Sequence, residues 1–271
     1  MIGLATLPFE VGPREALSPA ECEALAALPE YPPDGAPPFR VQVESRPLWP
    51  SGDPLPSPPR APLEMGWRDG RLGIRHRRFQ AEIDPYARTA RLFRFSADGY
   101  AVTAVLRAAL LARLPVEGGL ALHAAGLVMG PWGVAFFGPS GAGKSTLAAA
   151  APYGVLSDEL VVLSKAAGFH LRPSGFWSTL SPRPPEGGGV PLRALVELVK
   201  ADTFALERLR PAAAFRKLLP VATVPPADCL WEEALRLLRE VVEVVPVYRM
   251  AWALPAPPWD RLRRELSGDV A

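Results

Sequence analysis

Residues 138–145 form a glycine-rich segment that reads Gly-Pro-Ser-Gly-Ala-Gly-Lys-Ser. The segment matches the pattern G-x-x-x-x-G-K-[ST], in which backbone N–H groups surround a chain of phosphates. In that pattern the lysine, here Lys144, reaches the β- and γ-phosphates, and the hydroxyl of Ser145 ligates Mg²⁺. The residues that we therefore expect to bind a nucleotide are Gly138, Pro139, Ser140, Gly141, Ala142, Gly143, Lys144, Ser145 and Thr146.

The residues on either side of this segment support a phosphate site. Residues 132–137 form a short apolar run typical of a buried strand, and residues 145–151 are strong helix formers. A strand, a glycine loop and a helix in this order place an anion at the N-terminus of the helix. The context favours a phosphate site over a glycine-rich turn in a protein core.

Asp158 is the first of two adjacent acidic residues and lies only thirteen residues after Ser145. Pro152 and Gly154 limit the intervening helix to about two turns, and a new strand begins at residues 155–156. We expect this strand to be the neighbour of the one before the loop, because the connection is so short. The carboxyl ends of both strands then meet at one edge of the sheet, where α/β proteins bind ligands.

This arrangement places Asp158 near the γ-phosphate of a bound nucleotide. A carboxylate there either holds Mg²⁺ or accepts a proton from an attacking hydroxyl. If the strand continued, Glu159 would point to the opposite face, since side chains alternate along a strand. The candidate metal ligands are Ser145, Asp158 and Glu159. The alternative is that both acids only solvate the end of a strand.

The tight spacing of loop and acidic pair resembles the HPr kinase/phosphorylase family, whose nucleotide core is related to phosphoenolpyruvate carboxykinases. Three segments between about residues 120 and 163 carry the resemblance: Leu122–Gly126, Gly138–Thr146 and Leu156–Leu160. A looser similarity to HPr-kinase-related proteins covers residues 66–266. Some of those proteins phosphorylate the precursor peptides of ribosomal natural products.

The resemblance implies a kinase that uses ATP and Mg²⁺ and leaves a homo-oligomer open. His123 lies fifteen residues before Gly138, as the histidine of the family does. We therefore place His123 with Lys144 and Asp158 among the candidate catalytic residues. The alternative is a histidine whose hydrogen bonds are satisfied at the end of a buried strand.

Two departures from the family pattern concern the reaction. Thr146 stands where the HPr kinases have glutamate, and residues 187–193 lie where the family has an Arg-Gly stretch linked to phosphorolysis. Kinase chemistry therefore carries over better than the reverse activity, and HPr itself is a doubtful substrate.

Composition excludes several other classes of protein. A net charge of +2 over 271 residues is too small to indicate a nucleic-acid or anionic-membrane partner. Cys22 and Cys229 are far apart and lack metal-ligand spacing, and no apolar run reaches transmembrane length. We expect a cytoplasmic protein. The chain is rich in arginine, and its lysines are Lys144, Lys165, Lys200 and Lys217.

The sequence predicts an α/β fold with a mixed sheet in an HPr-kinase-type, carboxykinase-like nucleotide core, and a β-rich and helical N-terminal region. We expect a proline-rich region at 1–64, with a linker at 49–62, and a P-loop domain at 65–271 whose nucleotide core spans about 116–200. Ser18-Pro19 marks a helix start and Asp69-Gly70 a hairpin. Helices are expected at 20–28, 101–114, 211–219, 226–242 and 258–266, and strands at 39–44, 72–77, 79–83, 90–95, 159–164, 169–172, 195–200 and 247–254.

Several charged residues remain as weaker candidates. One of Arg172, Arg183 and Arg193 could neutralise charge on a transferred phosphoryl group, although the favoured reading of any single one is a surface residue. The loop at 183–190 is either a lid or an ordinary connection. The basic cluster at 71–78 is read as a solvated strand face or a site for an acidic peptide, and His76 and His170 as surface or strand residues.

The function predicted from these residues is transfer of the γ-phosphoryl group of ATP to a hydroxyl on a peptide, protein or small molecule. The alternative is a nucleotide-binding regulatory or scaffolding module without phosphotransfer. A carboxykinase would need a His/Lys/Asp set of manganese ligands, and the sequence offers no such set.

Overall fold

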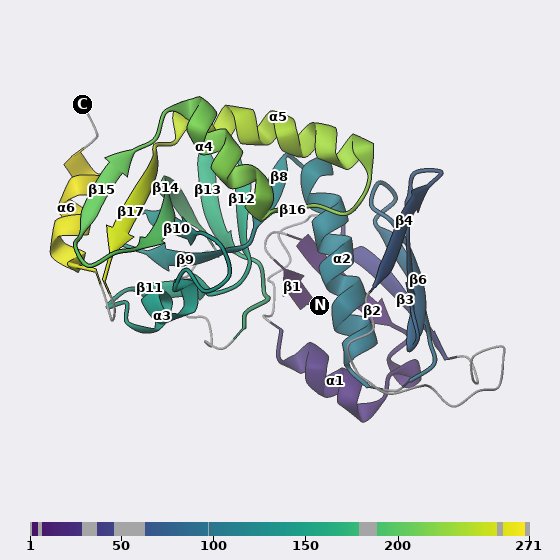
Figure 1. The fold of residues 1–271 in the computed structure, drawn as a ribbon. Coiled ribbons are helices and arrows are strands. Elements are labelled where there is room, and N and C mark those ends of the chain that lie inside the picture. Colours follow the sequence, from purple (N-terminus) through teal and green to yellow (C-terminus); the bar gives the residue numbers. More distant parts are fainter. Residues whose placement is uncertain are drawn as a thin grey trace. The chain divides into compact units, whose positions relative to one another are not determined.

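The chain divides into two compact units, which are described separately. Unit 1 is Met1–Glu117 with Val224–Trp231, and unit 2 is Gly118–Thr223 with Glu232–Ala271. Both contain helices and a mixed sheet, so the predicted α/β class is confirmed (Figure 1). The residues that this computed structural model describes are 2–4, 7–28, 37–45, 63–96, 98–178, 189–253 and 257–268.

In unit 1, seven strands of the described residues form one sheet in the order β1-β2-β3-β7-β6-β5-β4. Buried and exposed residues alternate along its strands, so one face is apolar and the other faces solvent. The strands are β1 (Ile2–Leu4), β2 (Leu7–Gly12), β3 (Phe39–Ser45), β4 (Glu64–Arg68), β5 (Arg71–His76), β6 (Phe79–Asp84) and β7 (Thr89–Arg94). The helices are η1 (Arg14–Ala16), α1 (Pro19–Ala26) and α2 (Tyr100–Val116).

Two local signals in unit 1 have the structures that the sequence predicts. The Ser18 hydroxyl accepts a hydrogen bond from the Glu21 amide, and the Glu21 carboxylate accepts one from the Ser18 amide, which makes a capping box at the start of α1. Asp69 and Gly70 have φ angles of 51° and 78° and join β4 to β5 in a hairpin.

The division between the units falls after Glu117, whereas the sequence suggested a boundary after residue 64. The cause is long-range pairing. β3 pairs in parallel with β7, so strands on both sides of residue 64 belong to one sheet. The predicted linker at 49–62 lies outside the described residues.

In unit 2, the described strands form a sheet in the order β11-β9-β10-β14-β13-β12-β8-β16, and β17 pairs with β14 and β15. The strands are β8 (Gly119–Leu122), β9 (Ala124–Val128), β10 (Gly133–Phe137), β11 (Gly154–Ser157), β12 (Val161–Lys165), β13 (Phe169–Pro173), β14 (Val190–Lys200), β15 (Ala205–Arg208), β16 (Ala222–Thr223) and β17 (Val247–Trp252). The helices are α3 (Lys144–Ala149), α4 (Pro211–Leu218), η2 (Leu219–Val221), α5 (Asp228–Val244), of which residues 228–231 belong to unit 1, and α6 (Trp259–Gly268).

The long strand β14 is the centre of unit 2. It lies between β10 and β17 and is parallel to both. Side chains of α3 and α6 pack on one face of these strands, where Val196 and Leu198 meet Leu147 and Leu262 in one apolar cluster. On the other face, Lys217 of α4 forms an ion pair with the buried Glu197. The short strands β1, β2, β9, β15 and β16 were not predicted, and β14 begins earlier than its apolar pattern suggested.

The strands before and after the phosphate loop are not neighbours, which corrects the prediction. β9 lies between β10 and β11 because residues 129–132 turn the chain back into an antiparallel hairpin. β9 is antiparallel to both strands, so β10 and β11 run in the same direction. Their carboxyl ends therefore still meet at one edge of the sheet, as expected.

Among the described residues, no helix is both long enough and apolar enough to cross a membrane. The longest helices, α2 and α5, have 17 residues each.

β9 approaches side chains of β12 and β13 so closely that position 126 has room only for glycine. Gly126 lies between Ala135 of β10 and Ser157 of β11, and a Cβ at this position would lie 2.8 Å from Cγ1 of Val161. We expect Gly126→Ala to lower the free energy of unfolding by about 1–3 kcal/mol, the usual cost of overpacking.

Urea unfolding measures this change. Gly168→Ala is the matched control, because Gly168 joins β12 to β13 and has no atom within 4 Å of the added Cβ. Equal stability of the two variants would show that the packing around β9 is looser than the structure indicates.

Candidate functional site

The glycine-rich loop joins the carboxyl end of β10 directly to the start of α3. Gly143 precedes the helix with a φ of 98°, a conformation that favours glycine. A Cβ at this position would also lie 2.8 Å from the ring of Trp252, which is buried at the end of β17. Both the backbone conformation and the packing therefore require glycine here. The expected order of strand, loop and helix is present.

Lys144 is buried at the first position of α3, with 7% of its surface exposed. Its ammonium donates hydrogen bonds to the carbonyl oxygens of Gly138, at 3.0 Å, and Pro139, at 3.3 Å. Burial lowers the pKa of Lys144 from 10.5, because removal from water disfavours the charged form. The loop thus holds its own lysine across the turn, where the positive charge is poorly solvated.

A cavity of about 290 Å³ opens beside this loop within unit 2. It brings the loop together with the acidic pair and the histidine that the sequence singled out. The cavity is lined by His123, Ser140, Gly141, Gly143, Lys144, Ser145, Thr146, Asp158, Glu159, Ser178 and Lys200. Three predicted loop residues are absent from this lining: Gly138 and Pro139 supply the carbonyl oxygens that hold Lys144, and Ala142 is buried in the apolar cluster.

Asp158 is the most buried carboxylate of the cavity, with 1% of its surface exposed. Its Oδ1 accepts a hydrogen bond from the backbone N–H of Ser178, at 2.9 Å. A buried carboxylate needs hydrogen-bond donors to offset the loss of water. The segment after β13 therefore holds the carboxylate in one orientation at the cavity wall.

The turn that presents both acids is stabilised by hydroxyl groups. Ser157 is fully buried, and its Oγ accepts hydrogen bonds from the amides of Glu159 and Leu160, both at 3.1 Å. The same hydroxyl donates to the carbonyl oxygen of Phe176 at 2.9 Å, and Ser174 donates to that of Leu160 at 2.6 Å. These bonds fix the turn against the segment that carries Ser178.

β11 ends at Ser157, so the alternation on which the opposite orientation of Glu159 depended does not apply. The chain turns at the acidic pair, and Glu159 lines the same cavity as Asp158. Strand alternation holds only within a strand, so the condition for the opposite orientation is not met, and Glu159 lies at the cavity, as expected for a candidate metal ligand.

His123 lies at the junction of β8 and β9 and is exposed at the cavity. Its backbone N–H donates to the carbonyl oxygen of Val221 at 2.7 Å, which fixes the main chain at this point. The side chain thus lies on the cavity side of the strand junction, and its catalytic role remains a prediction.

The arginines that the sequence offered as phosphate ligands are engaged elsewhere. The Arg172 guanidinium donates to Ser164 Oγ at 2.8 Å, and that of Arg193 donates to the carbonyl oxygen of Leu266 at 2.7 Å. Neither residue lines the cavity. Arg183 and most of the predicted lid at 183–190 lie outside the described residues.

The weaker candidates in unit 1 pack against aromatic rings or form ion pairs within that unit. His76 is buried beside the rings of Phe79 and Tyr100, with centroid distances of 5.3 and 5.4 Å. In the basic cluster, Arg78 pairs with Asp98 at 2.7 Å. In unit 2, His170 Nδ1 lies 3.2 Å from the Gly168 carbonyl oxygen, outside the cavity.

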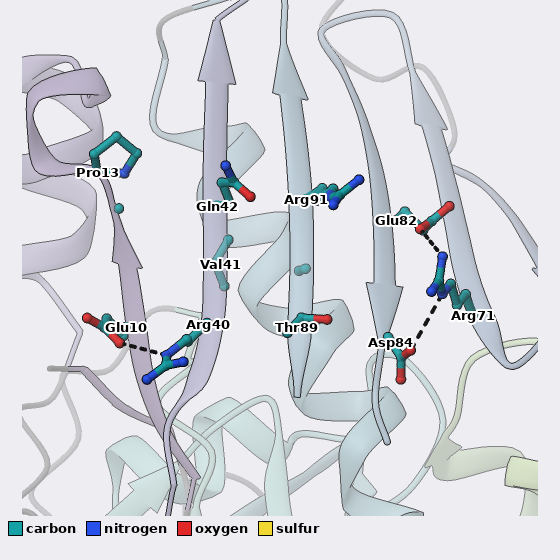
Figure 2. A pocket seen from close by; sticks show the side chains of 12 residues that line it. Glu10, Pro13, Arg40, Val41, Gln42, Arg71, Glu82, Asp84, Thr89 and Arg91 are labelled. Atoms are coloured by element: carbon teal, nitrogen blue, oxygen red, sulfur yellow. Dashed lines mark hydrogen bonds and ion pairs between the residues drawn. The ribbon is translucent and has the colours of Figure 1, made fainter. Parts of the chain in front are cut away.

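Unit 1 has a larger cavity, of about 600 Å³, on the solvent face of its sheet. In Figure 2, Arg40 is joined to Glu10, and Arg71 is joined to Glu82 and Asp84, each on a neighbouring strand, whereas no dashed line joins Arg91 to another labelled side chain. The distances are 3.3 Å for Arg40–Glu10, 2.9 Å for Arg71–Glu82 and 3.5 Å for Arg71–Asp84. Cross-strand pairs of opposite charge are usual on the exposed face of a sheet. We therefore take the smaller cavity of unit 2, with its glycine loop and buried acid, as the candidate site.

The sequence analysis missed two residues of the cavity, Lys200 and Ser178. Lys200 is one of only four lysines and stands at the end of a predicted strand, and this position could have identified it as a candidate for the ligand-binding edge of the sheet. Ser178 had no such signal, because its role depends on the turn after β13 that brings its amide to Asp158.

The donors around the cavity suit a magnesium ion. Within the described residues, no group of three or more His, Cys, Asp and Glu side chains is placed to hold a metal alone. Mg²⁺ usually takes one or two carboxylates and completes its shell with water and phosphate oxygens. The Ser145 hydroxyl with the carboxylates of Asp158 and Glu159 fits that requirement.

Comparison of the chain with models of protein families gives no match, and a search of curated proteins gives no match either. The geometry of the cavity is therefore the basis on which a function is proposed below.

The buried lysine predicts a specific dependence of stability on pH. The folded-state pKa of Lys144 is below 10.5, so between these two values the unfolded chain holds a proton that the folded chain has lost. Stability therefore rises with pH across that interval, and the penalty for the buried charge is fully present below it. We expect the wild-type protein to gain stability relative to Lys144→Met as pH rises towards 10.5.

Urea unfolding of both proteins at a series of alkaline pH values measures this difference, in which all other titrations cancel. Lys165→Met is the control, because Lys165 is an exposed residue paired with Glu240. A constant difference between wild type and Lys144→Met would contradict the burial of the ammonium.

Proposed function

We propose that this protein is an HPr-kinase-like P-loop kinase that transfers the γ-phosphoryl group of ATP to a hydroxyl. The observation that carries the proposal is that one cavity is lined by the glycine-rich loop, Lys144, Ser145 and the buried Asp158. A loop of this pattern binds phosphates. A carboxylate in the same cavity adds a group that can act on the acceptor.

Binding of the nucleotide in this proposal uses the N-terminus of α3. The backbone N–H groups of residues 140–145 surround the phosphates, and the helix dipole favours their negative charge. Lys144 exchanges its contacts with the carbonyl oxygens of Gly138 and Pro139 for contacts with the β- and γ-phosphates. Because its charge is already poorly solvated, little hydration is lost when it meets an anion.

Transfer in this proposal is an in-line displacement at the γ-phosphorus. The acceptor oxygen forms a bond to phosphorus while the bond from phosphorus to the β,γ-bridging oxygen breaks, and ADP leaves. The hydroxyl proton passes to the carboxylate of Asp158, which the Ser178 amide holds in orientation. With Asp158 as the base, Ser145 and Glu159 are the residues that would hold Mg²⁺, which would neutralise charge on the phosphates.

The acceptor that we propose is a hydroxyl group on a peptide, a protein or a small molecule. His123 and Glu159 line the cavity beside Asp158 and are the side chains best placed to meet it.

Two substitutions separate binding from transfer. Lys144→Ala is expected to weaken ATP binding by about 100-fold, because charge-assisted contacts to phosphate are lost. Asp158→Asn is expected to keep ATP binding within a few-fold of wild type and to lower the transfer rate by about 10²–10⁴, the usual contribution of a general base. Calorimetric titration with ATP measures binding, and labelled ATP with hydroxyl-bearing peptides and small molecules measures transfer.

Asp260→Asn on the exposed side of α6 and Lys165→Ala are the matched controls for charge removal in unit 2. A normal transfer rate in Asp158→Asn would show that Asp158 is not the general base. Tight ATP binding by the wild type with no product from any acceptor would instead support a nucleotide-binding regulatory module.

A further inference from the structure

Lys200 stands at the carboxyl end of β14, beside the phosphate loop. β14 is parallel to β10, so it ends at the same edge of the sheet. The loop rests on this strand: a Cβ at Gly138 would lie 3.2 Å from the carbonyl oxygen of Leu198, two residues before Lys200. On the next strand, Lys200 is opposite Trp252, whose ring lies against Gly143.

The four lysines of the chain have different surroundings. Lys165 pairs with Glu240, and Lys217 pairs with Glu197 at 2.7 Å. Lys144 donates to carbonyl oxygens of its own loop. Lys200 is exposed at the cavity and has no ion pair with any residue in the described part of the chain. Lys144 and Lys200 are thus the two lysines that form no ion pair in the described part of the chain, and the carbonyl contacts within the loop belong to Lys144.

We propose that Lys200 is a second cationic ligand of the phosphate site and binds the terminal phosphate of the nucleotide. The inference rests on the proposed function and extends it to a residue outside the glycine-rich pattern. The described arginines that the sequence offered for this role, Arg172 and Arg193, lie outside the cavity.

The charges of the cavity show why a second cation is needed. The ionisable side chains of the lining, apart from His123, are two lysines and two carboxylates. Without Lys200, the carboxylates of Asp158 and Glu159 would outnumber the lysine of the loop before any phosphate arrived. A lysine on a flexible stem also follows a phosphoryl group as it moves towards its acceptor, and it neutralises charge on the equatorial oxygens during transfer.

In this proposal, Lys200 and the loop bind different phosphates of the nucleotide. The loop amides and Lys144 surround the inner phosphates at the helix terminus. Lys200 comes from β14, on the other side of β10 from β9 and β11, and lines the same cavity as Asp158. As a ligand of the terminal phosphate, it is expected to contribute in complexes with a triphosphate and not in complexes with a diphosphate.

Titration of the full chain with ADP and with a non-hydrolysable ATP analogue, each with Mg²⁺, tests this assignment. Lys200→Ala is expected to weaken binding of the analogue by about tenfold, the loss of one charge-assisted hydrogen bond, and to change ADP binding by less than twofold. Lys200→Arg is expected to restore most of the analogue's affinity. Lys165→Ala is the control for the loss of one positive charge.

Equal weakening of ADP and the analogue in Lys200→Ala would overturn the assignment to the terminal phosphate. So would unchanged binding of both. If the wild-type protein bound both nucleotides but Lys200→Ala behaved like wild type, the kinase proposal would stand and the role of Lys200 would fall. If the wild type bound neither nucleotide nor inorganic tripolyphosphate, both proposals would be wrong.

Discussion

The antiparallel pairing of β9 with both β10 and β11 is the constraint on which the candidate site depends. One hairpin reverses the chain before the glycine-rich loop, and a second pairing on the other side of β9 restores the direction of β10 in β11. The loop and the acidic turn therefore leave the sheet at the same edge. Gly126 permits β9 to approach β12, because a side chain at position 126 would clash with Val161.

Hydrogen bonds in the turn at residues 157–160 and in the segment at 174–178 offset the cost of burying the carboxylate of Asp158. Asp158 loses nearly all contact with water, which is costly for a carboxylate without donors. The Ser178 amide supplies one donor, and the hydroxyls of Ser157 and Ser174 hold the two backbone segments together. The same bonds that stabilise the turn therefore also orient the group proposed to accept a proton. Stability and function are supported by one set of contacts.

Local signals in the sequence predicted local structure well. The capping box at Ser18, the Asp69-Gly70 turn and the glycine loop each depend on residues within a few positions of one another. The sequence could not predict that β9 separates β10 from β11, or that β3 pairs with β7 across the proline-rich segment, because both depend on contacts between distant residues. The site divides in the same way. Its loop and acids were read from spacing, whereas Ser178 enters only through a distant turn.

Two of the four lysines form fixed ion pairs, as many of the arginines do, and the other two line the candidate site. Arginine forms many of the fixed contacts, as in the pair of Arg94 with Glu21 in unit 1 and the pair of Arg249 with Glu197 in unit 2. A planar guanidinium matches a stationary carboxylate or carbonyl group well. The two cationic side chains that line the candidate site are lysines. A compact ammonium on a flexible stem can change partners as a phosphoryl group moves, whereas a guanidinium fork favours one fixed geometry. The presence of lysine at this edge of the sheet, in a chain that otherwise prefers arginine, is therefore an argument for an anion that is bound and then transferred.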